Sequence, residues 1–357
     1  MDEIALEVKG ESKKCRILVD GRAKEAMEIA DALHPSKIAI ICSPNTRRIA
    51  EGLADEAKNA AIIQVSDGER AKNLGSVERL YSSFLKARLN RKSVAIIVGG
   101  GSLGDTAAFA CSTFMRGIRF IQVPTTLLAM ADSSIGGKNG VNFMGKNLVG
   151  TFAQPSAVVI DFSLLKTLPR AQIQNGIAEI VKCGCIRDGA LFSFMGKNAG
   201  KIIGLEAEAL EFAVSRAIKI KMGIVSKDET EELHGSGKGR MLLNFGHTVG
   251  HALERISNYG LQHGEAVAIG MVKEAEICER LGICEIGTSE KIGKLLEKFG
   301  LPTRIAGKIP LQKLVARMRL DKKNISGKIR LAGLRKIGEG TIVENVDERM
   351  IRGVLGR

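Results

Sequence analysis

Aromatic side chains are scarce in this chain of 357 residues, which has no tryptophan and only two tyrosines. Proteins that bind single-stranded nucleic acid stack the bases on such side chains, so the scarcity argues against that class. A net charge of +14 nevertheless fits either a nucleic-acid surface or a basic cleft for an anionic small molecule. Because the lysines are spread along the chain and no nucleic-acid motif occurs, the second interpretation is favoured, with no nucleic-acid partner.

Signals for secretion and membrane insertion are also lacking. The first fifteen residues do not have the basic-then-apolar order of a signal peptide, and no apolar run is long enough to cross a bilayer. The seven cysteines are scattered, odd in number and without a CxxC pair, which is typical of a reduced compartment. We therefore expect a cytoplasmic protein with no membrane partner.

Short apolar segments alternate with helical patterns through the first half of the chain. The segments are 15–20, 37–42, 61–66, 93–98 and 119–123. This alternation predicts an α/β domain with a parallel, Rossmann-like sheet buried on both faces. From about Arg170 the pattern becomes helical. The expected domains are an α/β domain at 1–168 and a mostly α-helical domain at 169–357.

A glycine-rich turn, GGGSLGD at 99–105, follows one of these apolar segments and precedes a helical pattern. Glycines let a phosphate approach the backbone closely, and a helix N-terminus offers unbonded amides and a favourable dipole. No acidic residue on the next strand is placed to hold a ribose, so the match to a dinucleotide fingerprint is incomplete. The pattern predicts a turn that binds pyrophosphate.

A polar region rich in small residues follows at 124–147 and contains Lys138 and Lys146. Backbone amides beside a lysine are what phosphate groups require. We therefore expect a phosphate-binding loop, although a solvated loop remains an alternative, more so for Lys146 than for Lys138.

Three of the five histidines lie between residues 244 and 265. His247 and His251 are four apart, so on a helix their side chains leave the same face, and His263 follows a turn. This grouping is typical of a divalent metal site with three nitrogen or oxygen ligands, although helix-surface or core histidines are the alternative. Glu179, three residues before Lys182 on another expected helix, could add an oxygen ligand. Arg240 would face the same way as the two histidines if their helix began early.

The longest motifs occur in order between about Asp67 and Arg335. They are GGGSLGD, FMRG, VPTTLLAMADSSIGGKNGVN, GKNLVGTFAQP, LKTLP, AEIVKCG, LLNFGHTVGHALE and HGEAVAIGM. Together they resemble the 3-dehydroquinate synthases, within the wider group of sugar-phosphate cyclases and metal-dependent polyol dehydrogenases. The resemblance implies conversion of 3-deoxy-D-arabino-heptulosonate 7-phosphate to 3-dehydroquinate and phosphate in the shikimate pathway. NAD would be reduced and reoxidised within each cycle, so there is no net redox change.

The same resemblance implies that Glu179, His247 and His263 bind one divalent metal, zinc above all, with cobalt or iron as alternatives. Histidine spacing alone would favour His251 over His263 as a ligand. The family pattern instead places His251 near the substrate phosphate as an acid–base group.

Further residues are carried over to the substrate and to NAD. For the substrate they are Lys138, Asp132, Lys182, Lys221, Arg240, Asn244, Asn147, His251, one of Lys322 and Lys323, one of Glu231 and Glu232, and Arg116 from the neighbouring subunit of a homodimer. For NAD they are Asn45, Glu69, Lys72, Gly100, Gly101, Ser102, Asp105, Thr125, Thr126, Asp132, Lys138, Lys146 and Asn147. Ser43 stands where the family commonly has an acid that holds the adenosine ribose, so NADP is also conceivable.

Two enzyme classes compete with this assignment. One is another sugar-phosphate cyclase acting on a different heptulose phosphate. The other is a metal- and NAD-dependent polyol phosphate dehydrogenase, such as a glycerol-1-phosphate dehydrogenase, whose substrate has no carboxylate and does not require Arg240 and Lys221 to converge.

Overall fold

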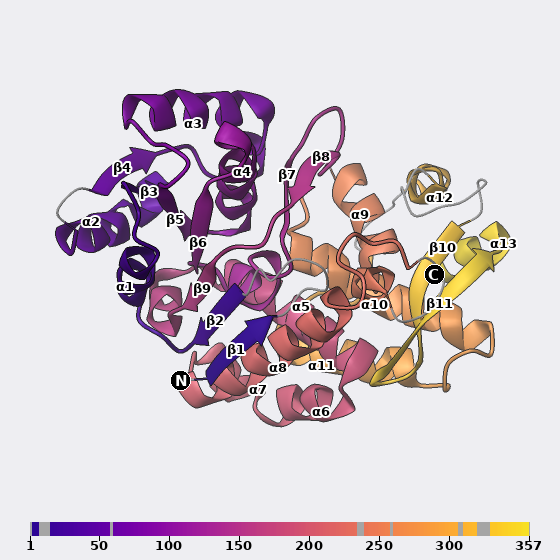
Figure 1. Cartoon of the computed structure of the whole chain (residues 1–357). Coiled ribbons are helices and arrows are strands. Elements are labelled where there is room, and N and C mark those ends of the chain that lie inside the picture. Colours follow the sequence, from indigo (N-terminus) through magenta and orange to yellow (C-terminus); the bar gives the residue numbers. More distant parts are fainter. Residues whose placement is uncertain are drawn as a thin grey trace. The chain divides into compact units, whose positions relative to one another are not determined.

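The computed structural model describes residues 2–6, 15–57, 60–233, 239–257, 260–305, 310–319 and 329–356. The chain divides into two compact units, Met1–Leu168 and Pro169–Arg357, whose elements are labelled in Figure 1. The first unit is α/β and the second is mostly helical, as the sequence predicts.

The first unit is built on a seven-stranded sheet in the order β1-β2-β9-β6-β5-β3-β4. Only β1 runs antiparallel to its neighbour, and the other six strands are parallel. The strands are β1 (Asp2–Leu6), β2 (Cys15–Val19), β3 (Ile38–Cys42), β4 (Ala60–Gln64), β5 (Val94–Gly99), β6 (Arg119–Pro124) and β9 (Ala157–Ile160). The helices are α1 (Glu25–Ala32), α2 (Arg47–Asp55), α3 (Leu74–Lys86) and α4 (Gly101–Thr113), with short helices η1 (Pro44–Thr46), η2 (Glu69–Ala71), η3 (Phe114–Arg116), η4 (Ala129–Ser133) and η5 (Phe162–Thr167).

Successive residues of each strand point to opposite faces of the sheet, and helices bury both faces. On β3, Ala39 and Ile41 pack in a core with residues of α3 and α4. Ile38 and Ile40 pack in a second core with residues of α1 and α2. A strand that is apolar at every position therefore suits this sheet, and β3 is buried along its whole length.

Two features of this unit differ from the sequence expectation. The strand β1 was not expected, and it pairs with β2 from Asp2↔Val19 to Leu6↔Cys15. The region expected as a polar loop contains the π-helical turn η4 and an antiparallel hairpin, β7 (Lys138–Val141) and β8 (Val149–Phe152). Glycines at two paired hairpin positions make these strands hard to predict from sequence. Glycine is required there, because a Cβ added to Gly140 or Gly150 would meet the opposite backbone.

The second unit is centred on two long helices, α5 (Arg170–Arg187) and α10 (His263–Arg280). Every residue of α5 from Asn175 to Ile186 is buried, so other elements surround this helix on all sides. The further helices are α6 (Gly189–Lys197), α7 (Ala199–Ile203), α8 (Ala207–Val225), η6 (Arg240–Asn244), α9 (His247–Ile256), α11 (Thr288–Lys298), α12 (Leu311–Arg319) and α13 (Glu348–Leu355). A hairpin of β10 (Ile329–Lys336) and β11 (Glu339–Val346) completes the unit.

Helices α9 and α10 approach each other closely through glycines. A Cβ added to Gly270 would lie 1.9 Å from the carbonyl oxygen of Gly246, and one added to Gly250 would lie 3.0 Å from the carbonyl oxygen of Ala266. Gly246 itself has φ +81°, a conformation that favours glycine. These glycines therefore set how closely the two histidine-bearing helices can pack.

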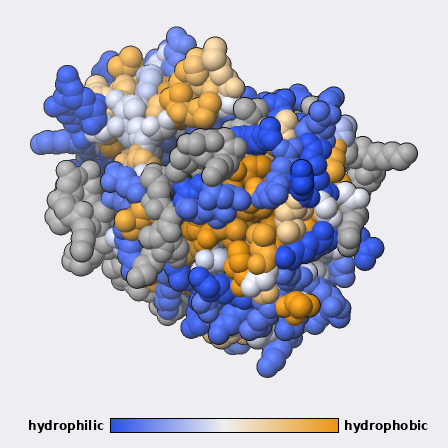
Figure 2. All heavy atoms as spheres, turned by 90° about the vertical axis from the view of Figure 1, so that its right-hand side faces the viewer, coloured by the Kyte–Doolittle hydropathy of each residue, from blue (hydrophilic) through white to orange (hydrophobic). Residues whose placement is uncertain are grey.

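Hydrophobic residues gather in the centre of the face shown in Figure 2, among mostly hydrophilic surroundings. Large apolar side chains with high exposure in the second unit include Ile286 (90%) and Leu233 (42%). Of the helices that the structure describes, none has the length and apolar character needed to cross a membrane.

Candidate metal and substrate site

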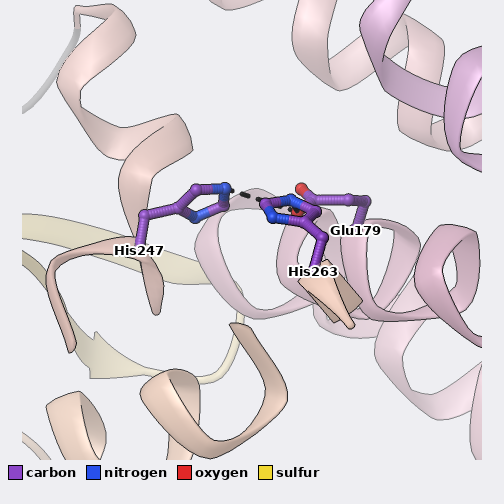
Figure 3. Close-up of side chains that lie close together, drawn as sticks. All are labelled: Glu179, His247 and His263. Atoms are coloured by element: carbon purple, nitrogen blue, oxygen red, sulfur yellow. Dashed lines mark hydrogen bonds and ion pairs between the residues drawn. The ribbon is translucent and has the colours of Figure 1, made fainter. Parts of the chain in front are cut away.

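Three side chains from three helices of the second unit converge in Figure 3: Glu179 from α5, His247 from α9 and His263 from α10. Oε1 of Glu179 lies 3.4 Å from Nε2 of His247 and 3.2 Å from Nε2 of His263. The ligand atoms of this trio all lie within 4.8 Å of one another. The Glu179 side chain is 1% exposed, so it presents its carboxylate from inside the core.

His247 is held by the way its helix begins. It is the first residue of α9, and the Glu274 carboxylate of α10 accepts hydrogen bonds from the backbone N–H groups of Gly246 (2.7 Å) and Val249 (2.9 Å). A side chain from a neighbouring helix thus satisfies amides that a helix N-terminus leaves unbonded. Nδ1 of His247 lies 3.2 Å from the carbonyl oxygen of Phe245, which leaves Nε2 facing Glu179.

His263 is the first residue of α10 and is similarly anchored. Gln262, which precedes it, forms a capping box with Glu265. The backbone N–H of Gly264 donates to Oδ1 of Asn175 on α5 at 2.8 Å. A Cβ on Gly264 would lie 2.5 Å from Cα of Asn175, so this approach requires glycine. Nε2 of His263 faces Glu179, and Nδ1 lies 3.2 Å from Oε1 of Glu254.

The charges around Glu179 oppose the effect of its burial. Burial alone would raise the pKa of Glu179, but the Lys182 ammonium ion-paired to it and the bonded His263 lower that pKa to about 2. Burial alone would lower the pKa of His263, but hydrogen bonds to Glu179 and Glu254 and their negative charges raise it to about 9. Without metal, the site therefore holds a proton on His263 at neutral pH.

This arrangement predicts how pH affects the metal-free protein. The pKa of His263 rises from 6.5 to about 9 on folding, so the stabilisation is complete below 6.5 and is lost as pH rises through 9. We expect the free energy of unfolding to fall by up to about 3 kcal/mol over this window, measured by denaturant unfolding of metal-stripped protein. His263→Gln should flatten the profile, and an unchanged slope in that variant would assign the effect to another group.

His251 lies one turn beyond His247 on α9 but outside the Glu179 trio. Its ring centroid is 5.1 Å from that of His247 and 6.3 Å from that of His263. It forms a second group of metal-compatible atoms with Glu254 and His263. The choice of His251 as a ligand from spacing alone therefore does not match the trio around Glu179.

The cationic residues predicted for the substrate carboxylate are on separate elements of this unit. Arg240 is 2% exposed at the start of η6, and Lys221 is half-buried on α8. Arg240 was expected to face the same way as the two histidines only if their helix began early, and this condition is not met, because η6 ends at Asn244 and the left-handed Gly246 precedes α9. The side-chain amide of Asn244 donates to the carbonyl of Met241 at 3.3 Å.

The position of Arg240 depends on Asp228, which the sequence did not single out. Oδ1 of Asp228 accepts hydrogen bonds from the backbone N–H groups of Glu232 (2.7 Å) and Leu233 (3.0 Å), and Oδ2 accepts from that of Arg240 (2.8 Å). Burial alone would raise the pKa of this carboxyl, but these backbone hydrogen bonds lower it. One carboxylate thereby joins the chain before Gly239 to the chain after it.

Two predicted substrate residues on polar segments of the chain have unusual backbone angles. Glu231 has φ +64° and Asn147 has φ +55°, which only a few per cent of non-glycine residues adopt. Such strain concentrates at functional sites. Glu232, the alternative to Glu231, is exposed, and Thr230 donates to its carboxylate. Lys322 and Lys323 lie outside the described residues.

In the first unit, predicted NAD residues surround the start of α4. Gly100 precedes the helix in an extended conformation with no side-chain cap, so the amides that follow it are not bonded by a capping side chain. Lys72 is 5% exposed and donates to Asp105 on α4 at 2.5 Å. Glu69 accepts hydrogen bonds from Ser102 (3.2 Å) and from Asn142 (2.7 Å).

The remaining predicted residues of this unit lie on several elements. Thr125 is buried just after β6, and Gly101 is the first residue of α4. Thr126 lies beside Gly100, where an added Cβ would lie 3.0 Å from the methyl group of Thr126. Asp132 lies in the π-helical turn η4, where π-bulges frequently mark functional sites. Lys138 on β7 and Asn45 on η1 are exposed, and Lys146 is half-buried in the turn of the β7–β8 hairpin.

Arg116 is exposed at the end of η3 and has φ +67°, next to Met115 with φ +51°. Two consecutive non-glycine residues in this region are costly, so the surrounding structure must hold them there. The nearby hairpin β7–β8 contacts the end of α4, where Ser112 Oγ and Thr151 Oγ1 are 2.7 Å apart. Exposed apolar side chains follow on this hairpin, including Met144 (97%) and Leu148 (59%).

Sequence reasoning missed Glu254 and Glu274. Glu254 lies three residues after His251 in the motif GHALE, a spacing that could have identified it as a histidine partner. Glu274 is 0% exposed on α10, but in the sequence it lies between Lys273 and Glu276, as a residue of a solvated helix face would. No pattern therefore singled it out, and its partners on α9 could not be found without the structure.

Comparison with known proteins supports one family. The 3-dehydroquinate synthase N-terminal model matches residues 62–175, and the C-terminal model matches residues 176–324. A 3-dehydroquinate synthase of Desulforamulus reducens is 41% identical over 312 residues, covering 87% of this chain and 86% of that protein. One of Nostoc punctiforme is 39% identical over 328 residues, covering 89% of each.

Solved structures agree on the fold. A 2-deoxy-scyllo-inosose synthase complexed with carbaglucose-6-phosphate, NAD+ and Co2+ matches with a TM-score of 0.88 and 25% identity, covering 99% of both chains. A 2-epi-5-epi-valiolone synthase of Streptomyces hygroscopicus, with NAD+ and Zn2+ bound, has the same fold at a TM-score of 0.86 and 24% identity, covering 96% of this chain and 95% of that one. With both family models and curated relatives matching over most of its length, the chain belongs to the 3-dehydroquinate synthase family, the enzymes of the cyclisation step in the shikimate pathway.

Proposed function

We propose that Glu179, His247 and His263 hold one divalent metal at which this chain converts 3-deoxy-D-arabino-heptulosonate 7-phosphate to 3-dehydroquinate. The observation that carries the proposal is the spacing of the three ligand atoms. Atoms around a tetrahedral zinc at about 2.0–2.1 Å lie about 3.3–3.4 Å apart, and Oε1 of Glu179 lies 3.4 Å and 3.2 Å from the two Nε2 atoms. One carboxylate and two imidazoles suit Zn²⁺ best, although Co²⁺ and Fe²⁺ accept the same donors.

A metal so held would bind two adjacent substrate hydroxyls and lower the pKa of the one to be oxidised. Lys182, which is 2% exposed and ion-paired to Glu179, keeps that ligand ionised and supplies a donor toward a substrate hydroxyl. His251 is one-third exposed beside His247, which supports its proposed role of exchanging a proton with bound substrate. Asp132 and one of Glu231 and Glu232 would orient further hydroxyl groups.

The anionic ends of the substrate would be bound by cations and amides. Arg240 and Lys221 are proposed for its carboxylate, since a guanidinium can bind a carboxylate through two parallel hydrogen bonds. Residues proposed for its phosphate are Lys138, Asn147, Asn244, His251, a lysine of the pair 322 and 323, and Arg116 of a neighbouring subunit. The relatives named 3-dehydroquinate synthase favour the heptulosonate over a polyol phosphate.

The first unit is proposed to bind NAD at the start of α4. Uncapped amides there and a glycine at Gly100 suit a pyrophosphate, and the synthase complexed with NAD+ and Co2+ shares the fold. When bound, NAD takes up and returns one hydride. The Lys72–Asp105 pair and the Glu69–Ser102–Asn142 hydrogen bonds would hold the polar groups in this region. Ser43 carries no charge to repel a 2′-phosphate, so binding of NAD and NADP should be compared directly.

The test is to incubate the protein with the heptulosonate phosphate, NAD and Zn²⁺. Free phosphate and 3-dehydroquinate should form in equal amounts, without accumulation of NADH, and both should cease after metal removal by a chelator. Zn²⁺ or Co²⁺ should restore them. Accumulation of NADH with a polyol phosphate, and no phosphate release from the heptulosonate, would contradict the proposal in favour of a dehydrogenase.

A homodimer in which Arg116 reaches the partner's site gives a sharper test. Arg116→Ala and Glu179→Gln should each be inactive alone, because one lacks the arginine and the other a metal ligand. A mixed dimer has one complete site, so equal amounts after subunit exchange should recover about a quarter of wild-type activity. The exposed apolar side chains Met144 and Leu148 on the hairpin beside α4 are consistent with a covered face. Absence of recovery, with exchange verified by mass, would place Arg116 in its own subunit's site.

A further inference from the structure

His263 is held between two carboxylates, and only one of them belongs to the proposed metal trio. Nε2 lies 3.2 Å from Oε1 of Glu179, and Nδ1 lies 3.2 Å from Oε1 of Glu254. Glu254 is on α9, and its side chain is 5% exposed. A carboxylate so buried needs compensating hydrogen bonds, and the imidazole N–H supplies one.

His247 shows the same arrangement with a different partner. Its Nδ1 lies 3.2 Å from the backbone carbonyl oxygen of Phe245, an atom that can only accept, so Nδ1 carries the proton and Nε2 is left to bind a metal. Both histidines therefore direct Nε2 toward Glu179 and Nδ1 toward an oxygen acceptor. The acceptor at His247 is neutral, whereas the acceptor at His263 is a carboxylate.

We propose that Glu254 is a positioning residue that holds His263 in the tautomer with Nδ1–H, orients its ring and makes Nε2 a stronger ligand. Carboxylate partners of metal-bound histidines act in this way, and their loss typically weakens metal binding by about 10- to 100-fold. The proposal rests on the proposed metal site and adds a residue outside it. The other carboxylate oxygen of Glu254 lies 4.0 Å from Nε2 of His251, so the two oxygens of this side chain lie nearest to two different histidines.

The competing interpretation is a second ion held by His251, Glu254 and His263, whose donor atoms are also grouped. In that case His263 would have to lose its Nδ1 proton and bridge two cations as an imidazolate, with Nε2 on one ion and Nδ1 on the other. The hydrogen-bonded interpretation needs no such step, and it explains why the carboxylate is 3.2 Å from Nδ1. Metal stoichiometry distinguishes the two.

The experiment measures Co²⁺ and Zn²⁺ affinity by competition with a chelator in the wild-type protein, Glu254→Ala, Glu254→Gln and Glu254→Asp. We expect one ion per wild-type chain, binding about 10- to 100-fold weaker in Glu254→Ala, a smaller loss in Glu254→Gln and partial rescue in Glu254→Asp. The visible absorption of bound Co²⁺ should shift in Glu254→Ala, because a rotated imidazole changes the ligand field. The matched control is Glu265→Gln, a half-buried α10 carboxylate two residues from His263 whose amide can still serve the capping box.

Equal affinity in Glu254→Ala and wild type would overturn the proposal, as would two ions per wild-type chain with one lost in the variant. Denaturant unfolding of the metal-free variants checks that each one folds. If Glu254→Ala does not fold, the Co²⁺ spectrum of Glu254→Gln provides the test, because glutamine has nearly the same shape as glutamate. Failure of the wild-type protein to bind any metal would instead contradict the proposed function.

Discussion

Replacing Glu179 by glutamine should remove both the metal and the activity of this protein. The amide is a far weaker ligand than the carboxylate, and several kcal/mol of transition-state stabilisation depend on the metal, so we expect turnover to fall by about a thousandfold or more. The change also leaves Lys182 buried, at 2% exposure, without its ion-pair partner. Removing one partner of such a pair typically costs about 3–5 kcal/mol. Metal content and denaturant unfolding measure the two effects.

A matched double variant separates the loss of the metal from the loss of stability. Glu179→Gln combined with Lys182→Met removes the buried ammonium as well, so most of the lost stability should return while metal and activity stay lost. Glu179→Gln with full metal occupancy, or with activity within tenfold of wild type, would show that the trio is not the catalytic centre.

The second large effect is expected at Gly270, on the face of α10 that packs against α9. An added Cβ would lie 1.9 Å from the carbonyl oxygen of Gly246 and 3.0 Å from the backbone nitrogen of Gly250. Backbone atoms cannot move aside as a flexible side chain can, so the two helices must separate. Gly270→Ala should cost at least about 3 kcal/mol of stability, measured by denaturant unfolding. It should also weaken metal binding, because His247 and His263 are carried by these helices.

Gly223→Ala is the control for this prediction. Gly223 lies in helix α8 with no atom within 4 Å of an added Cβ, so alanine should stabilise the protein by about 0.5–1 kcal/mol through its better helix propensity. If both alanine variants unfolded at the same denaturant concentration as wild type, the close approach of α9 and α10 would not be required for the fold.

The α/β alternation was predictable because it depends on local periodicity. Buried strands such as β3 and β5 are continuous apolar runs, and such runs between helical patterns are a strong signal. The strand β1 was missed because it is defined by pairing with β2, a contact between segments that neither segment reveals alone. The hairpin of β7 and β8 was missed because Gly140 and Gly150 are poor strand formers, kept there by the close approach of the two backbones.

The candidate site was only partly predictable from residue spacing. The i,i+4 pair His247 and His251 correctly indicates one helix face, yet the two imidazoles that face the Glu179 carboxylate belong to His247 and His263. Whether a histidine sixteen residues away returns to the same point depends on the turn between two helices and on their glycine contacts. Those are tertiary features, so the residues alone made Glu179 and His263 candidates, and only the family resemblance chose His263 over His251 as a ligand.

The carboxylate of Asp228 has a consequence for how this chain can change in length. Because it binds the backbone N–H groups of both Leu233 and Arg240, the anchor of Arg240 does not depend on the residues that join these two. A change in chain length between Leu233 and Gly239 should therefore displace Arg240 less than a substitution of Asp228 does.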